Sequence, residues 1–209
     1  MLKLIVFDCD GVILDSKESN VRYYNDLLNL FGHPPMDPAE EVYSHMATVD
    51  GALKHIFRNY PQKRTEIKHA AREKLHYPDY LCYLSLEPDL IEFLELAQKK
   101  YKLAISTNRS DSIYPLLEKY NLGHYFSKVM TVLNTKPKPA PDGLLEILQD
   151  LKCLPEEAVF LGDSETDRLQ AEACRVSLIA FKNPALQAEW HVSSFMKLLQ
   201  LPPFQQAAL

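Results

Sequence analysis

Two aspartates near the start of the chain have the spacing of a catalytic or metal-binding pair. Asp8 and Asp10 flank Cys9 and are followed by Gly11. They come directly after a mostly apolar run, residues 2–7, that is typical of a buried strand. Open α/β sheets place their ligands at the carboxyl ends of parallel strands, and two carboxylates this close need a cation or a shared proton. The segment predicts a Mg²⁺-dependent site in which one aspartate attacks and the other transfers protons, or else a plain Asp-Gly turn.

Three later segments carry polar residues that suit the same site. They are residues 103–108, 136–141 and 158–167. If the strands that lead into them are parallel neighbours, these segments meet at one edge of the sheet. They would bring together carboxylates, a hydroxyl, an amide and an ammonium. That set suits phosphoryl transfer, where catalysis consists mainly of positioning and charge neutralisation.

The elements that must position these residues follow from the apolar periodicity. A helical block comes after the first strand, and from Pro88 onward strands alternate with helices. Such alternation predicts βαβ units and a parallel sheet, so the fold class is α/β with an all-α cap inserted after strand 1. We predict a core of residues 1–15 and 85–209 and a cap of residues 16–84. The predicted helices cover residues 18–31, 38–46, 49–58, 63–77, 90–100, 113–120, 144–151, 168–173 and 194–199, and the later strands 102–106, 128–132, 158–161 and 176–180.

The composition is ordinary for a soluble globular protein, with 46% hydrophobic and 24% charged residues. A net charge of −5 argues against a nucleic acid polymer as partner. With neither a signal peptide nor a membrane-spanning stretch visible, we expect a cytoplasmic protein that binds no membrane. The spacing of Cys9, Cys82, Cys153 and Cys174 fits no zinc site, so buried reduced thiols are expected. A monomer and a homodimer both stay open.

In this order and spacing, the four motif segments resemble the four motifs of the haloacid dehalogenase-like hydrolase superfamily. The helical block after strand 1 is similar to that of its phosphoglycolate phosphatase-like branch. The resemblance implies a Rossmann-like three-layer α/β/α core, a helical-bundle cap, a Mg²⁺ cofactor and a small phosphorylated metabolite as substrate. The dehalogenase branch lacks an acid at the position of Asp10, so the resemblance favours a phosphatase or a mutase over a dehalogenase.

The resemblance also implies a role for each motif residue. Asp8 matches the nucleophile that forms an aspartyl-phosphate, and Asp10 matches the general acid/base. Thr107 matches the hydroxyl that binds the phosphoryl group, with Asn108 beside it. Lys138 matches the lysine that neutralises the phosphoryl group and the nucleophile.

The same resemblance implies a metal shell and a second acid. Asp163 matches a Mg²⁺ ligand, joined by the Asp8 carboxylate and the Asp10 backbone carbonyl, a shell that suits this ion. Asp167 matches an acid that orients the metal waters or Lys138, or that occasionally ligates the metal itself. In the cap, the loop from Thr48 to Gly51 resembles a specificity loop, so Gly51 is a candidate for substrate contact.

Simpler interpretations apply to several neighbours. Lys136 also begins a Lys-Pro-x-Pro sequence, but the spacing to the following helix favours Lys138, which makes Lys136 a solvated lysine. Arg109 could approach the substrate or the acids of the metal loop, but a solvated loop arginine is the favoured interpretation. Thr107 could cap the next helix in addition to any other role. Cys9 should point into the core because strand side chains alternate.

Two alternatives to a phosphatase stay open. A phosphosugar mutase of the β-phosphoglucomutase type would share every core residue and differ in how its cap rebinds a bisphosphate. A non-catalytic module that binds a phosphorylated metabolite is the other alternative, although it would not need all four motif acids.

Overall fold

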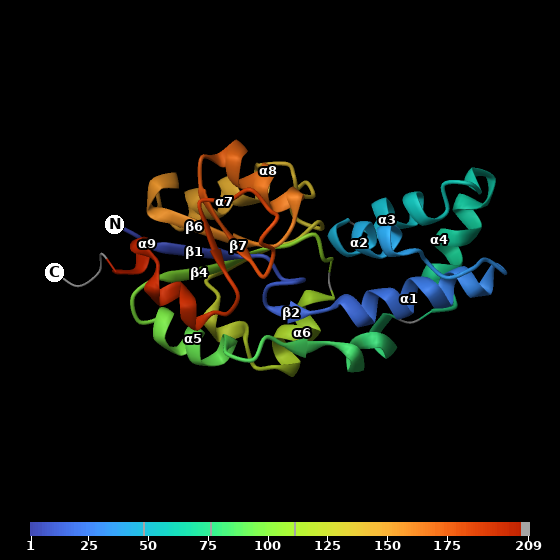
Figure 1. Ribbon diagram of the computed structural model, residues 1–209, viewed down its shortest axis with the longest axis horizontal. Helices are drawn as coiled ribbons and strands as arrows, with labels where there is room; N and C mark the ends of the chain where they lie inside the picture. The colour runs from blue at the N-terminus through green and yellow to red at the C-terminus, as the bar shows by residue number, and fades with distance from the viewer. Residues whose placement is uncertain (48, 76, 111, 206–209) are drawn as a thin grey trace. The chain divides into compact units, whose positions relative to one another are not determined.

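The computed structural model describes residues 1–47, 49–75, 77–110 and 112–205, and the chain forms two compact units (Figure 1). The first unit comprises Met1–Leu14 and Leu86–Leu209, and the second comprises Asp15–Ser85. A ribbon of β2 (Leu14–Asp15) and β3 (Ser85–Leu86) lies where the chain leaves and re-enters the first unit. The second unit is therefore an insertion after β1 and β2.

The first unit is built on a six-stranded sheet in the order β5-β4-β1-β6-β7-β8, with every neighbouring pair parallel. Its central strand β1 pairs with β4 on one side and β6 on the other. All four residues of β1 are buried, as expected for a strand covered on both faces. The strands are β1 (Leu4–Phe7), β4 (Lys102–Ser106), β5 (Lys128–Met130), β6 (Ala158–Gly162), β7 (Ser177–Phe181) and β8 (Trp190–Val192).

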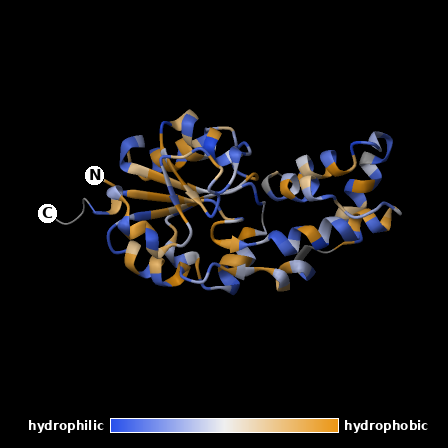
Figure 2. Ribbon diagram, viewed as in Figure 1, coloured by the Kyte–Doolittle hydropathy of each residue, from blue (hydrophilic) through white to orange (hydrophobic). Residues whose placement is uncertain are grey.

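Helices cover both faces of this sheet, as Figure 1 shows. On one face, α7 (Asp142–Asp150) and α8 (Glu165–Cys174) pack Leu144, Ile147 and Ala171 against the strands. On the other face lie α5 (Leu90–Ala97) and α6 (Ile113–Lys119). Figure 2 shows the strands as hydrophobic and the helices as mixed, which is the pattern of a three-layer α/β/α core.

An aromatic cluster joins the second face to the end of the chain. Phe7 of β1 lies edge-on to Phe93 of α5, with ring centroids 6.3 Å apart. Phe195 packs on both rings from the C-terminal segment, which continues as a 3₁₀ helix, Met196–Gln200, and a short helix α9 (Pro202–Gln205). This packing holds β1, α5 and the segment around Phe195 in one core.

The second unit is helical and has its own core. Its helices are α1 (Lys17–Leu30), α2 (Pro38–Met46), α3 (Val49–Ile56) and α4 (Arg64–Glu73). Leu27, Phe57 and Ile67 are buried among the side chains that line it. A capping box between Asp37 and Glu40 explains where α2 begins. Among the described residues, no helix has the length and apolar character needed to cross a membrane.

The α/β fold with a helical insertion is confirmed, and most elements lie within a few residues of their predicted bounds. Three predictions were wrong. The expected last helix, residues 194–199, is a 3₁₀ helix preceded by a strand, β8, that was not predicted. The helix expected at 63–77 ends at Glu73. Cys82 is exposed, whereas Cys9, Cys153 and Cys174 are buried, and all four are free thiols.

Candidate active site

The motif segments meet because their strands are neighbours in one parallel sheet. Asp8 directly follows β1, Thr107 follows β4 and Asp163 follows β6. Phe7 is in register with both Ile105 and Leu161, so the three strands end at the same level. The carboxyl edge of the sheet therefore collects the polar residues that the sequence placed after each strand.

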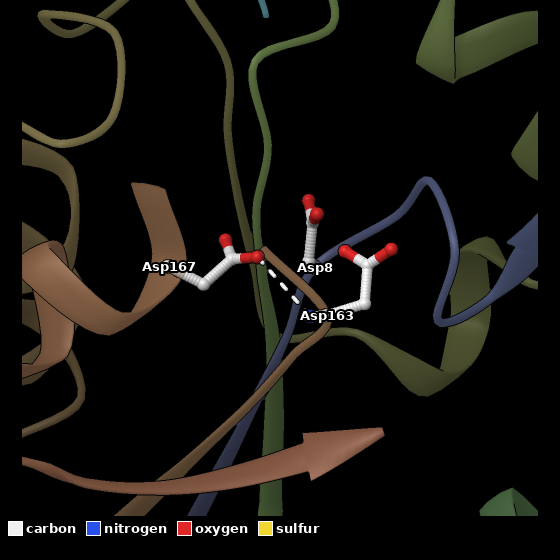
Figure 3. Close-up of side chains that lie close together, drawn as sticks. All are labelled: Asp8, Asp163 and Asp167. Carbon is white, nitrogen blue, oxygen red and sulfur yellow. Dashed lines mark hydrogen bonds between the residues drawn. The ribbon is translucent and has the colours of Figure 1, made fainter. Parts of the chain in front are cut away.

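Three carboxylates converge at this edge. Ligand atoms of Asp8, Asp163 and Asp167 all lie within 4.8 Å of one another. Figure 3 shows Asp8 coming from the end of β1, Asp163 from the end of β6 and Asp167 from the first turn of α8, with their side chains gathered together. Carboxylates at this separation repel unless a cation lies among them.

Lys138 is the ammonium that contacts this cluster. Its Nζ lies 2.6 Å from Asp8 Oδ1 and 2.6 Å from Asp167 Oδ1, and its side chain is only 3% exposed. Burial alone would lower the pKa of Lys138, but the charges of Asp167 and Asp8 outweigh it and raise that pKa above its ordinary value. Lys138 is therefore a permanent cation that bridges two of the acids.

Both carboxylate oxygens of Asp167 accept hydrogen bonds. Oδ1 accepts from Lys138 Nζ, and Oδ2 accepts from the backbone N–H groups of Asp163 and Ser164 and from the Ser164 hydroxyl. Ser164 and Asp167 also form the capping box that begins α8. These contacts indicate that Asp167 positions Lys138 and the backbone of residues 163–164, and they favour this role over metal ligation.

Negative charge is unfavourable on the remaining two acids, Asp8 and Asp163. Burial and the Asp167 carboxylate raise the pKa of Asp8 to about 7, and the same two causes raise the pKa of Asp163 to about 9. Lys138 opposes both shifts without cancelling them. An additional cation beside Asp8 and Asp163 would remove this electrostatic cost.

The backbone around Asp163 is shaped to hold its carboxylate in place. Gly11 has φ +77°, and a Cβ there would lie 2.0 Å from Asp163 Oδ2. From the other side, Asn183 Nδ2 donates to the Asp163 backbone carbonyl at 2.7 Å. A glycine that leaves room for a carboxylate, together with oxygen donors from Asp8 and Asp163, fits a hard divalent cation such as Mg²⁺. Asn183 was not singled out from the sequence, since an asparagine after a strand is an ordinary loop residue.

Thr107 and Asn108 lie at the end of β4 but engage different partners. The Thr107 backbone N–H donates to Met130, and its hydroxyl oxygen accepts from the Arg109 N–H at 3.1 Å. Because α6 begins only at Ile113, Thr107 is not its cap. The Asn108 amide contacts the Lys138 backbone twice: its Oδ1 accepts from the N–H at 2.7 Å and its Nδ2 donates to the carbonyl at 3.3 Å. Asn108 thus anchors the loop that carries Lys138.

The expectation of a solvated Arg109 was wrong. This residue is only 8% exposed, and its Nε and Nη2 donate to the two oxygens of Asp10 at 2.7 Å and 2.6 Å. The partners are 99 residues apart in sequence, so no local pattern could reveal the pair. Lys136, by contrast, has a 73% exposed side chain paired with Asp142, as expected for a solvated lysine.

The cap candidate Gly51 lies in the helical unit. It falls in the first turn of α3, which begins at Val49 like the predicted helix over 49–58, so Gly51 is a helical residue and not part of a loop. Thr48 lies outside the described residues. Contact between Gly51 and a substrate stays a prediction.

Comparison with known proteins shows which family the chain belongs to. A family model described as haloacid dehalogenase-like hydrolase matches residues 5–181. The chain belongs to this family. The matched range begins in β1 and ends with β7, and it includes every predicted site residue.

Relatives named as phosphatases or hydrolases are similar to the chain over most of its length. A phosphoglycolate phosphatase from Aliivibrio fischeri is 33% identical, over 82% of this chain and 80% of its own length. One from Haemophilus influenzae is 28% identical, over 95% and 97%. The crystal structure of a haloacid dehalogenase-superfamily hydrolase from Geobacter sulfurreducens is 32% identical, covers 95% of both chains and superposes with a TM-score of 0.78. The expected enzyme class, a phosphatase of this hydrolase family, is confirmed.

Proposed function

We propose that the chain is a Mg²⁺-dependent phosphatase that hydrolyses a small phosphorylated metabolite through an aspartyl-phosphate on Asp8. One observation carries the proposal: the buried Asp8 carboxylate is held by the buried Lys138 beside two further acids at the sheet edge. The relatives named phosphoglycolate phosphatase support a substrate of that class, a small phosphomonoester with a further anionic group.

The first step would use the Asp8 carboxylate. Its Oδ1 accepts hydrogen bonds from Lys138 Nζ and from the Cys9 N–H, both at 2.6 Å. These bonds orient the group, so that Oδ2 can attack phosphorus in line while the bond to the leaving oxygen breaks. Lys138 would neutralise charge on the nucleophile and on the transferring phosphoryl group. The Thr107 hydroxyl, whose oxygen accepts from the Arg109 N–H, would donate to that group.

Asp10 would complete both halves of the reaction. As an acid it protonates the leaving oxygen, and as a base it takes a proton from the water that hydrolyses the aspartyl-phosphate. Mg²⁺, held by Asp8, Asp163 and the Asp10 backbone carbonyl, would supply charge neutralisation for the phosphoryl oxygens. Asp167 keeps Lys138 and the Asp163 loop in place.

A direct assay tests the proposal. The wild-type protein should release phosphate from p-nitrophenyl phosphate only with Mg²⁺, and Asp8→Asn should abolish the release. Asp150→Asn is the matched control, because this exposed aspartate on α7 pairs with Lys128 away from the site. An inactive wild type, or an active Asp8→Asn, would overturn the proposal. A panel of phosphoglycolate, phosphosugars and nucleoside monophosphates then identifies the substrate, with free phosphate distinguishing hydrolysis from isomerisation.

A further inference from the structure

A buried arginine holds the side chain of Asp10. Arg109 Nη2 lies 2.6 Å from Asp10 Oδ1 and Arg109 Nε lies 2.7 Å from Asp10 Oδ2. The side chains are 6% and 19% exposed, respectively. A guanidinium is a rigid planar fork that fixes both oxygens of a carboxylate at once, so the contact sets the direction in which the carboxylate points.

The arginine is itself held from its backbone. Its N–H donates to the Thr107 hydroxyl oxygen at 3.1 Å, and its carbonyl accepts from the Val132 N–H at 3.1 Å. Thr107 in turn is tied to Met130 at the end of β5. Arg109 therefore extends from a segment that strands β4 and β5 keep in place, whereas Asp10 lies in the turn that follows β1.

We propose that Arg109 is a positioning residue that orients the Asp10 carboxylate for proton transfer to the leaving oxygen and from the hydrolytic water. The inference rests on the proposed function, in which Asp10 is the acid/base. A proton-transfer group must lie within hydrogen-bond reach of its target, and a displacement of about 1 Å can cost about 100-fold in rate. Without the fork, Arg109 no longer fixes the direction of the Asp10 carboxylate.

The two chemical steps depend differently on Asp10, and this difference provides the test. The p-nitrophenolate group leaves without being protonated, so formation of the aspartyl-phosphate from p-nitrophenyl phosphate does not require Asp10. Its hydrolysis does require a base. For an alkyl phosphate, both steps need Asp10, because an alkoxide must be protonated as it leaves.

Arg109→Met should therefore change the kinetics in a recognisable way. With p-nitrophenyl phosphate we expect a rapid burst of p-nitrophenolate, with an amplitude near the enzyme concentration, followed by turnover about 100-fold slower than wild type. With an alkyl phosphate, turnover should fall at least as far and no burst of alcohol should appear. Arg109→Lys keeps the charge without the fork and should restore only part of the rate.

A double-mutant cycle separates positioning from direct substrate binding. In an Asp10→Asn background, Arg109→Met should cost nothing further, because the group it positions is already inactive. If Arg109→Met lowered the rate of the Asp10→Asn variant by the same factor as that of the wild type, the inference would be overturned. It would also be overturned if Arg109→Met slowed the burst as much as the later turnover.

Controls keep the inference separable from folding and from the proposed function. Lys128→Met removes a cation from the same unit, on β5, and should leave both phases unchanged. Melting curves show whether Arg109→Met folds; if it does not, Arg109→Lys carries the same cycle. Wild-type protein that shows no Mg²⁺-dependent turnover would defeat the proposed function, whereas active wild type with an unaffected Arg109 variant would defeat only this inference.

Discussion

The geometry of Gly11 predicts that Gly11→Ala will have two separable effects, one on stability and one on metal binding. The first is backbone strain, because Gly11 has φ +77° and an L-residue in the left-handed region costs about 1–2 kcal/mol. For a chain of this size, that cost lowers the melting temperature by about 2–8 °C. The second effect is steric and falls on the carboxylate itself.

The steric effect can be estimated from the distances. The added Cβ would lie 2.0 Å from Asp163 Oδ2 and 2.6 Å from its Cγ, closer than such atoms approach in proteins. Relief requires the carboxylate to move by about 1 Å, whereas metal–ligand distances tolerate about 0.2 Å. We therefore expect Mg²⁺ affinity to fall by about 10–100-fold, the range seen when the support of a ligand is lost.

Gly32→Ala is the matched control, because Gly32 has a similar backbone and different surroundings. Its φ is +69°, but nothing lies within 4 Å of its added Cβ. It should show the strain effect alone: a lower melting temperature with unchanged metal affinity. Calorimetric titration with Mg²⁺ and melting curves in EDTA measure the two effects separately. If Gly11→Ala bound Mg²⁺ like Gly32→Ala, the role of Asp163 as a ligand held by this close approach would be refuted.

Three further predictions concern the same site. Asn108→Ala removes two hydrogen bonds to the Lys138 backbone and should lower kcat about tenfold with little change in KM. Steady-state kinetics that showed a rise in KM alone would indicate that Asn108 binds the substrate phosphate instead. Lys138→Met leaves buried carboxylates uncompensated and should lower the free energy of unfolding of the metal-free protein by about 3–5 kcal/mol, measured with urea in EDTA. The pKa values of Asp8 (about 7) and Asp163 (about 9) lie above their ordinary values, so protons compete with the metal, and Mg²⁺ affinity should rise from pH 6 to pH 9 in titrations. Because of the same raised pKa values, the folded metal-free protein binds more protons than the unfolded chain, so its melting temperature should fall from pH 6 to pH 9. A Mg²⁺ affinity or a melting temperature that did not change with pH would contradict the raised pKa values of Asp8 and Asp163.

Sequence reasoning worked where one strand and its next few residues carry the information. The apolar run of β1 predicts a strand covered on both faces, and Asp8 follows it directly. The same holds for β6 and Asp163. Once alternation of strands and helices indicates a parallel sheet, the strand ends must share one edge. The carboxylate cluster therefore followed from local patterns together with one rule of topology.

Contacts between segments that are distant in the sequence could not be predicted in this way. Asn183 supports Asp163 from a loop 20 residues away. Gln170 of α8 joins β4 to the loop that carries Lys138: its side chain accepts from the Ser106 hydroxyl and donates to the Ala140 carbonyl. Periodicity reports whether a residue is buried on its own element, but not which charged or polar group from another element it will meet. The short strand β8 was missed for a related reason: three residues are too few to show alternation.

The Arg109 contact explains how two aspartates of one motif can have different chemistry. Asp8 faces Lys138 and the other acids, whereas both oxygens of Asp10 are bound by Arg109. Among the described residues, the acids with ligand atoms close enough to share a metal include Asp8 and exclude the Asp10 side chain. Two carboxylates in such different surroundings can serve as nucleophile and as acid/base within one site. Lys138 and Arg109 together balance two of the four motif carboxylates, and the two remaining negative charges are what one divalent cation would neutralise.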